Sequence, residues 1–235
     1  MAESIFHFKE FSVQQDRCAM KVGTDGVLLG AWTDAKKCRT ILDIGTGTGL
    51  IALMIAQRHP AEIDAIDIDL PSVEQARENV LASPWSARIR VIHQELASFQ
   101  PGYLYDLIVS NPPYFIDSYA AAGEARHNAR SASASLSHEE LLLGIIRLLK
   151  EDGRFSLILP GREGQLFREQ AEKRGFYCNK LVRVCTGRDK PVKRILMEFS
   201  RTDFPLVEED LTIHYREREF TDAYKNLTGD FYTVF

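Results

Sequence analysis

The sequence predicts an α/β fold, a three-layer, Rossmann-like sandwich in which helices cover both faces of a mostly parallel sheet. Apolar β-type runs alternate with amphipathic helical runs between residues 40 and 174. Parallel neighbours need long crossovers, which are usually helical, so this alternation indicates parallel pairing. Two later β-type runs share only a short charged turn, which indicates an antiparallel hairpin at one edge of the sheet.

The predicted strands are short runs with strong apolar character. They lie at residues 40–44, 63–68, 89–92, 106–109 and 155–159, and the hairpin strands lie at 180–185 and 194–199. Apolar residues three or four positions apart predict helices at 50–60, 72–81, 137–150 and 163–174. Ser137 and Glu140 form a capping-box pattern at the start of the third helix, and Gly153 is expected to break the chain after it.

The composition is that of a globular protein with one main core. The chain has 235 residues, of which 45% are hydrophobic and 26% are charged. We divide it into an N-terminal segment, residues 1–38, and a single globular domain, residues 39–235. The first residues lack the apolar centre of a signal peptide, and no apolar run reaches the roughly 18 residues of a membrane span. We therefore expect a cytoplasmic monomer without membrane contacts.

Charge and cysteine spacing argue against two further classes of protein. The net charge of -4 is not that of a constitutively basic nucleic-acid binder, so any RNA contact must depend on a local patch. The four cysteines have no CxxC spacing and no histidine partners at zinc-finger distance. We expect reduced thiols and no metal site.

A glycine-rich turn follows the first predicted strand and leads directly into a helix. In the run Asp43–Gly49 (DIGTGTG), the glycines allow a tight turn and the close approach of a ligand. Only Thr48 separates the second and third glycines, so the spacing differs from the dinucleotide fingerprint, and no Lys-Ser or Lys-Thr pair marks a P-loop. A ligand at this turn need carry no phosphate.

A carboxylate follows at the interval expected for a ribose contact. Asp67 ends the second predicted strand about 20 residues after the glycines, where it can accept both ribose hydroxyls. An adenosine with free hydroxyls and no phosphate points to S-adenosylmethionine, with S-adenosylhomocysteine as the product. Glu95 and Leu96, after the third strand, are placed to meet the adenine. We assign the cofactor to Asp43, Gly45, Thr46, Gly47, Gly49, Asp67, Ile68, Glu95 and Leu96.

The fourth predicted strand leads into Asn111-Pro112-Pro113-Tyr114, which we predict to be the catalytic turn. The prolines remove two N–H donors, so the Asn111 side-chain oxygen and the Pro112 carbonyl remain as acceptors. Two acceptors can hold the hydrogens of an exocyclic amine and favour the positive nitrogen that forms during methyl transfer. Tyr114 offers a face on which a planar group can stack. Transfer to a flat amino or amide nitrogen is the predicted chemistry, without a catalytic histidine.

With these motifs in place, the chain resembles the class I methyltransferases with an Asn-Pro-Pro-Tyr motif. Three segments are more specific and resemble the bacterial tRNA1(Val) (adenine-N6)-methyltransferases. They are RCAMKVGTDG at 17–26 with LLGAW at 28–32, SPW at 83–85, and YKNLTGDFY at 224–232. The resemblance covers nearly the whole chain, although Glu95 stands where the family commonly has Asp.

The resemblance implies a class I methyltransferase fold and a substrate adenine at nucleotide 37 of a valine tRNA. It also implies that residues 21–26 fold over the cofactor, which adds Lys21, Gly23, Thr24 and Asp25 to the cofactor residues.

Two groups of basic residues are candidates for RNA contacts near the active site. Arg126 and Arg130 follow the catalytic turn, and the predicted hairpin carries Arg188, Lys190, Lys193 and Arg194. A few phosphate contacts and one extruded base can hold a structured tRNA. The alternative is an ordinary solvated surface.

Other functions remain open at this point. A protein glutamine N5-methyltransferase presents an amide of the same geometry, but such enzymes usually carry a helical N-terminal domain that 38 residues cannot form. An rRNA guanine-N2 methyltransferase is another member of the same class. A non-enzymatic RNA-binding or chaperone protein that retains the fold is the alternative outside it.

Overall fold

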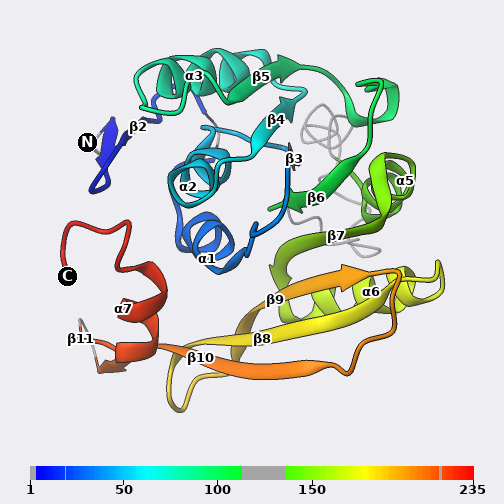
Figure 1. Cartoon of the computed structure of the whole chain (residues 1–235). Coiled ribbons are helices and arrows are strands. Elements are labelled where there is room, and N and C mark those ends of the chain that lie inside the picture. Colours follow the sequence, from blue (N-terminus) through cyan, green and yellow to red (C-terminus); the bar gives the residue numbers. More distant parts are fainter. Residues whose placement is uncertain (1–3, 19, 113–135, 217–218) are drawn as a thin grey trace, which may run out of the picture.

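A large mixed sheet forms the centre of the molecule, and helices cover both of its faces (Figure 1). The computed structural model describes residues 4–18, 20–112, 136–216 and 219–235. Within these residues the sheet has nine strands in the order β11-β10-β8-β9-β7-β6-β3-β4-β5. The predicted three-layer α/β class is confirmed.

The predicted strands all form, and the parallel part of the sheet contains five of them. They are β3 (Thr40–Ile44), β4 (Glu62–Asp67), β5 (Ile89–His93), β6 (Tyr105–Ser110) and β7 (Leu149–Pro160). The antiparallel strand β9 (Val192–Ser200) lies between β7 and β8 (Tyr177–Gly187), which confirms the hairpin.

Two strands that the sequence analysis missed extend the sheet beyond this hairpin. These are β10 (Val207–Arg216), which pairs parallel with β8, and β11 (Glu219–Phe220), which pairs with β10. The first four residues of β10, Val-Glu-Glu-Asp, are exposed. A strand whose first half lies in solvent lacks the apolar run on which the strand predictions were based.

Each face of the sheet has its own apolar core. One core receives residues from α1 (Thr24–Trp32), α2 (Leu50–Arg58), α3 (Leu70–Leu81) and α7 (Asp222–Thr228). The other core receives residues from α5 (His138–Leu148) and α6 (Gly161–Glu172). Successive residues of β3 divide between the two, because Ile41 packs in the first and Leu42 in the second.

The N-terminal segment is more regular than predicted, and it packs against the C-terminal residues. It forms the two-stranded sheet of β1 (Ile5–His7) and β2 (Ser12–Gln14), followed by α1. Phe8 forms a bridge with Tyr232, and their rings stack with centroids 6.0 Å apart. The two ends of the chain therefore lie close together (Figure 1).

Gly153 does not break the chain, and this prediction was wrong. The preceding helix α5 ends at Leu148, two residues before the predicted end, and Gly153 lies inside β7. The register of β7 against β6 shifts between Leu149 and Arg154. A Cβ at Gly153 would lie 2.8 Å from the Leu149 side chain, so the glycine permits close packing at this irregularity.

A buried carboxylate joins three segments at the β5 side of the sheet. Asp64 of β4 accepts two hydrogen bonds from Arg90, at 2.8 and 2.9 Å, and one each from the hydroxyls of Tyr103 and Tyr105. Burial alone would raise the pKa of Asp64, but these four hydrogen bonds outweigh it and lower the pKa. The ionised form is therefore part of the folded state.

We expect Asp64→Asn to reduce the free energy of unfolding by about 2 kcal/mol. The change removes a charged acceptor whose side chain is only 6% exposed, while its partner Arg90 is 60% exposed and can be hydrated. Because the folded pKa is lowered, this contribution is present above the ordinary value of 3.8 and is lost as the pH falls through the folded pKa. Urea unfolding of both proteins between pH 7 and pH 3 measures it. Tyr103→Phe should cost about 1 kcal/mol, and a pH-independent difference for Asp64→Asn would contradict this account.

Candidate active site at the carboxyl edge of the sheet

The glycine-rich turn and the Asn-Pro turn leave the sheet side by side. Strands β3 and β6 are parallel neighbours, and Ile44 lies opposite Ser110. The Ser110 hydroxyl donates a hydrogen bond of 2.9 Å to the Ile44 carbonyl and fixes this register at the strand ends. Gly45 and Asn111 are the next residues of the two strands, so their backbones are separated by about 5 Å, the spacing of neighbouring strands.

The glycine-rich turn requires glycine at three positions. Gly45, Gly47 and Gly49 have φ values of 71°, 55° and 82°, in the left-handed region. A Cβ added at Gly45 or Gly47 would meet no atom within 4 Å, whereas one at Gly49 would contact Ala76. The first two glycines therefore border open space, as the backbone of a ligand-binding turn should.

Asp67, at the end of β4, supports this turn. Its Oδ2 accepts a hydrogen bond of 2.8 Å from the Gly47 N–H, and its Oδ1 accepts one of 3.0 Å from the Asp69 N–H. Burial raises the pKa of Asp67, and the two N–H donors partly offset that effect. A carboxylate has about four acceptor sites, so Asp67 can hold the turn and still accept the hydroxyls of a ribose.

Asp43 is a fully buried acid beneath the turn. Its Oδ2 accepts a hydrogen bond of 2.7 Å from the Thr46 hydroxyl, and its Oδ1 has no hydrogen-bonding partner among the described residues. Burial raises the pKa of Asp43 to about 7; the Thr46 hydroxyl and, more weakly, the Ala52 backbone act in the opposite direction. A buried acid with a raised pKa and an unpartnered oxygen is an unusual feature beside this open space.

The remaining predicted cofactor residues differ in exposure. Ile68 and Glu95 are exposed at the same edge, and Glu95 directly precedes the short helix η1 (Leu96–Ser98), with no hydrogen bond from its side chain to the helix. Leu96 is buried in the core with α5, where a Cβ at Gly144 would lie 2.5 Å from its side chain. Leu96 therefore packs beneath the edge, and its contact with an adenine remains a prediction.

Two amides of α3 that the sequence analysis overlooked attach the N-terminal segment to this edge. Asn79 donates hydrogen bonds of 2.9 Å to the carbonyls of Gln14 and Thr48 and accepts one of 2.8 Å from the Gln14 N–H. Gln75 accepts one of 3.3 Å from the Arg17 N–H. Both are buried on the apolar side of α3, and an amide on the apolar side of a predicted helix was the signal available in the sequence.

The segment that the resemblance places over the cofactor starts beside Asn111. The Met20 sulfur lies 3.9 Å from the Asn111 amide nitrogen. After it, Lys21, Gly23 and Thr24 are exposed. Asp25, at the start of α1, forms an ion pair of 2.7 Å with Arg194 of β9, and both side chains are about one-fifth exposed, 22% and 20%.

The structure describes only part of the predicted catalytic and RNA-contact residues. Asn111 is half-buried and Pro112 is buried, whereas Pro113, Tyr114, Arg126 and Arg130 lie outside the described residues. The cations of the predicted hairpin are all described. Arg188, Lys190 and Lys193 are exposed, and Arg194 is held by Asp25.

Comparisons with known proteins agree with a functional site at the carboxyl ends of β3 and β6. The sequence profile named "Methyltransferase small domain" matches residues 20–155, which include the whole glycine-rich turn and Asn111. The chain belongs to this family.

Full-length relatives place it more narrowly, among the tRNA1(Val) (adenine(37)-N6)-methyltransferases. A protein of that name from Phocaeicola vulgatus is 46% identical over 99% of both chains. One from Trichodesmium erythraeum is 44% identical over 99% of both chains. One from Serratia proteamaculans is 43% identical over 98% of this chain and 90% of its own length. The family predicted from the sequence is therefore confirmed.

Solved structures support the fold. A predicted O-methyltransferase from Agrobacterium tumefaciens has a TM-score of 0.68 and 19% identity, over 88% of this chain and 96% of its own. A putative RNA methyltransferase from Pyrococcus horikoshii has a TM-score of 0.52 and 15% identity, over 74% and 79%. Among the described residues, no helix meets the length and hydropathy of a membrane span, and no group of three His, Cys, Asp or Glu side chains is placed to hold a metal ion.

The methyl donor of this family is S-adenosylmethionine, and the described residues fit it. The open space above Gly45 and Gly47 admits a ligand against the backbone. Asp67 keeps acceptor sites for ribose hydroxyls, and Asp43 has an unpartnered oxygen beneath the turn. These features suit an uncharged adenosine better than a phosphate, because the nearest side chains are carboxylates.

We expect Gly45→Ala to weaken the binding of S-adenosylhomocysteine at least tenfold, because the new methyl group enters the ligand space and φ is 71°. Gly175→Ala is the matched control, since Gly175 has φ of 77°, equally open surroundings and a position far from the edge, after α6. Each change should reduce stability by about 1 kcal/mol from backbone strain alone. Calorimetric titration separates them, and equal affinities for the two variants would contradict the assignment.

Proposed function

We propose that this protein transfers the methyl group of S-adenosylmethionine to the exocyclic N6 amine of an adenine in tRNA, namely adenine 37 of tRNA1(Val). One observation carries the proposal, the similarity along the full chain to relatives that bear the name of this activity, at 46% identity over 99% of both chains. The geometry of the carboxyl edge supports it, because the glycine-rich turn and Asn111 follow paired residues of the adjacent strands β3 and β6.

Asn111 and Pro112 would hold the acceptor amine in this reaction. S-adenosylmethionine supplies an electrophilic methyl group on a sulfonium. The Asn111 side-chain oxygen and the Pro112 carbonyl accept the two hydrogens of the amine and direct the nitrogen towards the donor turn. The same oxygens favour the positive charge that develops on nitrogen, and a proton leaves after the methyl group has been transferred. We retain Tyr114, outside the described residues, as the stacking partner of the adenine.

We further propose that residues 1–38 cover the cofactor site and that residues 39–235 form the catalytic domain. Hydrogen bonds from Asn79 to β2 and to the glycine-rich turn support this division, as does the Asp25–Arg194 ion pair at the start of α1. A tRNA substrate supports a cytoplasmic location. The glycine-rich turn and Asn111 come from the same chain, which supports a monomer.

The proposal is tested by incubating the purified protein with labelled S-adenosylmethionine and total tRNA from a strain that lacks it, followed by nucleoside analysis. We expect the label in N6-methyladenosine of tRNA1(Val). Label in another tRNA nucleoside, or label transferred only when ribosomal RNA or cell protein replaces the tRNA, would replace the substrate proposed here. Binding of RNA without any label transfer would favour a non-enzymatic role.

We expect Asn111→Ala to lower kcat by a factor of about 100 to 1,000, the usual effect of removing one group that stabilises a transition state. Affinity for S-adenosylhomocysteine should be unchanged, because the side chain contacts the acceptor. Asn226→Ala, on the exposed side of α7, is the control and should retain full activity. Turnover by Asn111→Ala at the control rate would remove Asn111 from the catalytic residues.

A further inference from the structure

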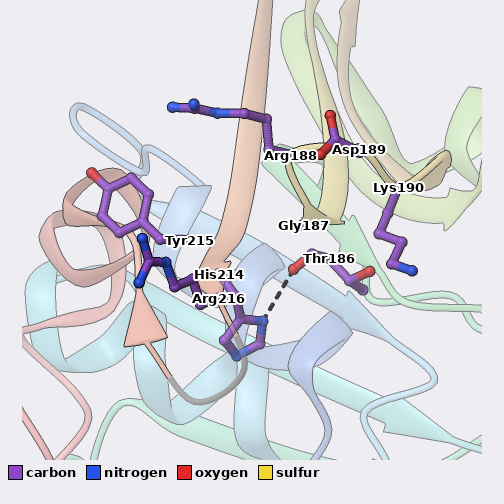
Figure 2. Close-up of a pocket in the computed structure, with 8 residues that line it drawn as sticks. All are labelled: Thr186, Gly187, Arg188, Asp189, Lys190, His214, Tyr215 and Arg216. Atoms are coloured by element: carbon purple, nitrogen blue, oxygen red, sulfur yellow. Dashed lines mark hydrogen bonds between the residues drawn. The ribbon is translucent and has the colours of Figure 1, made fainter.

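A groove at the carboxyl ends of β8 and β10 contains Arg188 and Lys190, two of the cations that the sequence analysis named as candidates for RNA contacts. Its volume is about 620 Å³, and Figure 2 shows the residues that line it. One side is the turn after β8, and the other is the end of β10. The lining residues are Thr186, Gly187, Arg188, Asp189, Lys190, His214, Tyr215 and Arg216.

The topology places this groove on the edge that carries the active site. Strand β10 runs parallel to β8, with His214 opposite Gly187, and both are antiparallel to β9, which is antiparallel to β7. The carboxyl ends of β8 and β10 therefore point in the same direction as those of β3 and β6. Four strand spacings separate β6 from β10, which corresponds to about 19 Å. This distance spans on the order of six nucleotides along one strand of a helix.

Within the described part of the chain, the cations of the groove form no ion pairs with neighbouring acids. Among the described residues, no carboxylate lies within 4.0 Å of the basic groups of Arg188, Lys190 or Arg216. By contrast Arg183, further back on β8, bonds to Glu208 at 2.7 Å and Asp210 at 2.8 Å.

Asp189 is the one acid among the lining residues, so the groove is positive in a chain whose net charge is -4. An unneutralised basic patch on an acidic protein favours a polyanionic partner.

His214 and Tyr215 give this groove features that suit a nucleic-acid backbone. The His214 Nδ1 is 3.1 Å from the Thr186 carbonyl, a contact that joins β10 to β8. The His214 imidazole also stacks on Phe220 of β11, with ring centroids 4.7 Å apart. Tyr215 is 48% exposed beside Arg216 (Figure 2). Exposed cations and an exposed aromatic ring in one groove are the features with which proteins bind phosphates and unpaired bases.

We propose that this groove binds the ribose-phosphate backbone of the RNA substrate several nucleotides from the methylated base, an inference that rests on the proposed function. Arg188, Lys190 and Arg216 contact phosphates, and Tyr215 offers a surface for a base or ribose. The groove and the active site would then hold two points of one tRNA along a single edge. This assigns a role to His214, Tyr215 and Arg216, and it separates Arg188 and Lys190 from Arg194, whose guanidinium pairs with Asp25.

The test is the salt dependence of tRNA binding in the presence of S-adenosylhomocysteine. The variant R188Q/K190Q/R216Q should lower the slope of log affinity against log salt concentration by about 2 to 3, because each lost phosphate contact removes roughly 0.7 to 0.9. Its affinity at low salt should fall at least tenfold. Affinity for S-adenosylhomocysteine should stay at the wild-type value, because none of the three residues lies at the glycine-rich turn.

Lys173→Gln is the matched control, because Lys173 is exposed at the end of α6, at the opposite edge of the sheet. It should leave the slope unchanged. The single variants K190Q and R216Q test the two sides of the groove separately, with an expected decrease of about 1 each.

Each outcome decides between the claims. If the wild-type protein methylates tRNA but the triple variant has the same salt-dependence slope as the wild type, only the groove proposal is overturned. An equal loss in Lys173→Gln and in K190Q, each of which removes one positive charge, would also overturn it, since it would reflect overall charge. Failure of the wild-type protein to bind or methylate tRNA would overturn the proposed function and the groove together.

Discussion

The parallel pairing of β3 with β6 is the constraint on which the site depends. Because Ile44 and Ser110 are opposite each other and joined by the Ser110 hydroxyl, the residues that follow them start from neighbouring positions. A shift of one residue would turn every side chain of one strand to the other face, so two apolar cores fix this register firmly. Packing of the two cores thus fixes the positions from which the glycine-rich turn and Asn111 start.

Around this pair of strands, acidic and amide groups support the glycine-rich turn from three directions. Asp67 supports it from β4, Asp43 supports it from beneath by accepting a hydrogen bond from Thr46, and Asn79 supports it from α3. Asn79 also binds the backbone of β2, so the N-terminal segment and the turn share one anchoring side chain. Asn79 of α3 therefore joins the N-terminal segment to the glycine-rich turn.

The sequence was sufficient for the features that depend on local chemistry. Alternating apolar runs predicted the strands β3 to β9, and the glycine spacing predicted the tight turn after β3. It was insufficient where long-range contacts decide. The exposed first half of β10 carries no apolar pattern, and Gly153 packs closely against Leu149 instead of ending an element. The Asp25–Arg194 pair joins residues 169 positions apart, which no local pattern predicts.

The most direct test of the central claim is a crystal structure of the protein with S-adenosylhomocysteine. We predict that the ligand lies against Gly45 and Gly47, that its ribose hydroxyls donate to Asp67, and that its sulfur faces Asn111. A ligand bound elsewhere, or one whose sulfur points away from the end of β6, would contradict the account.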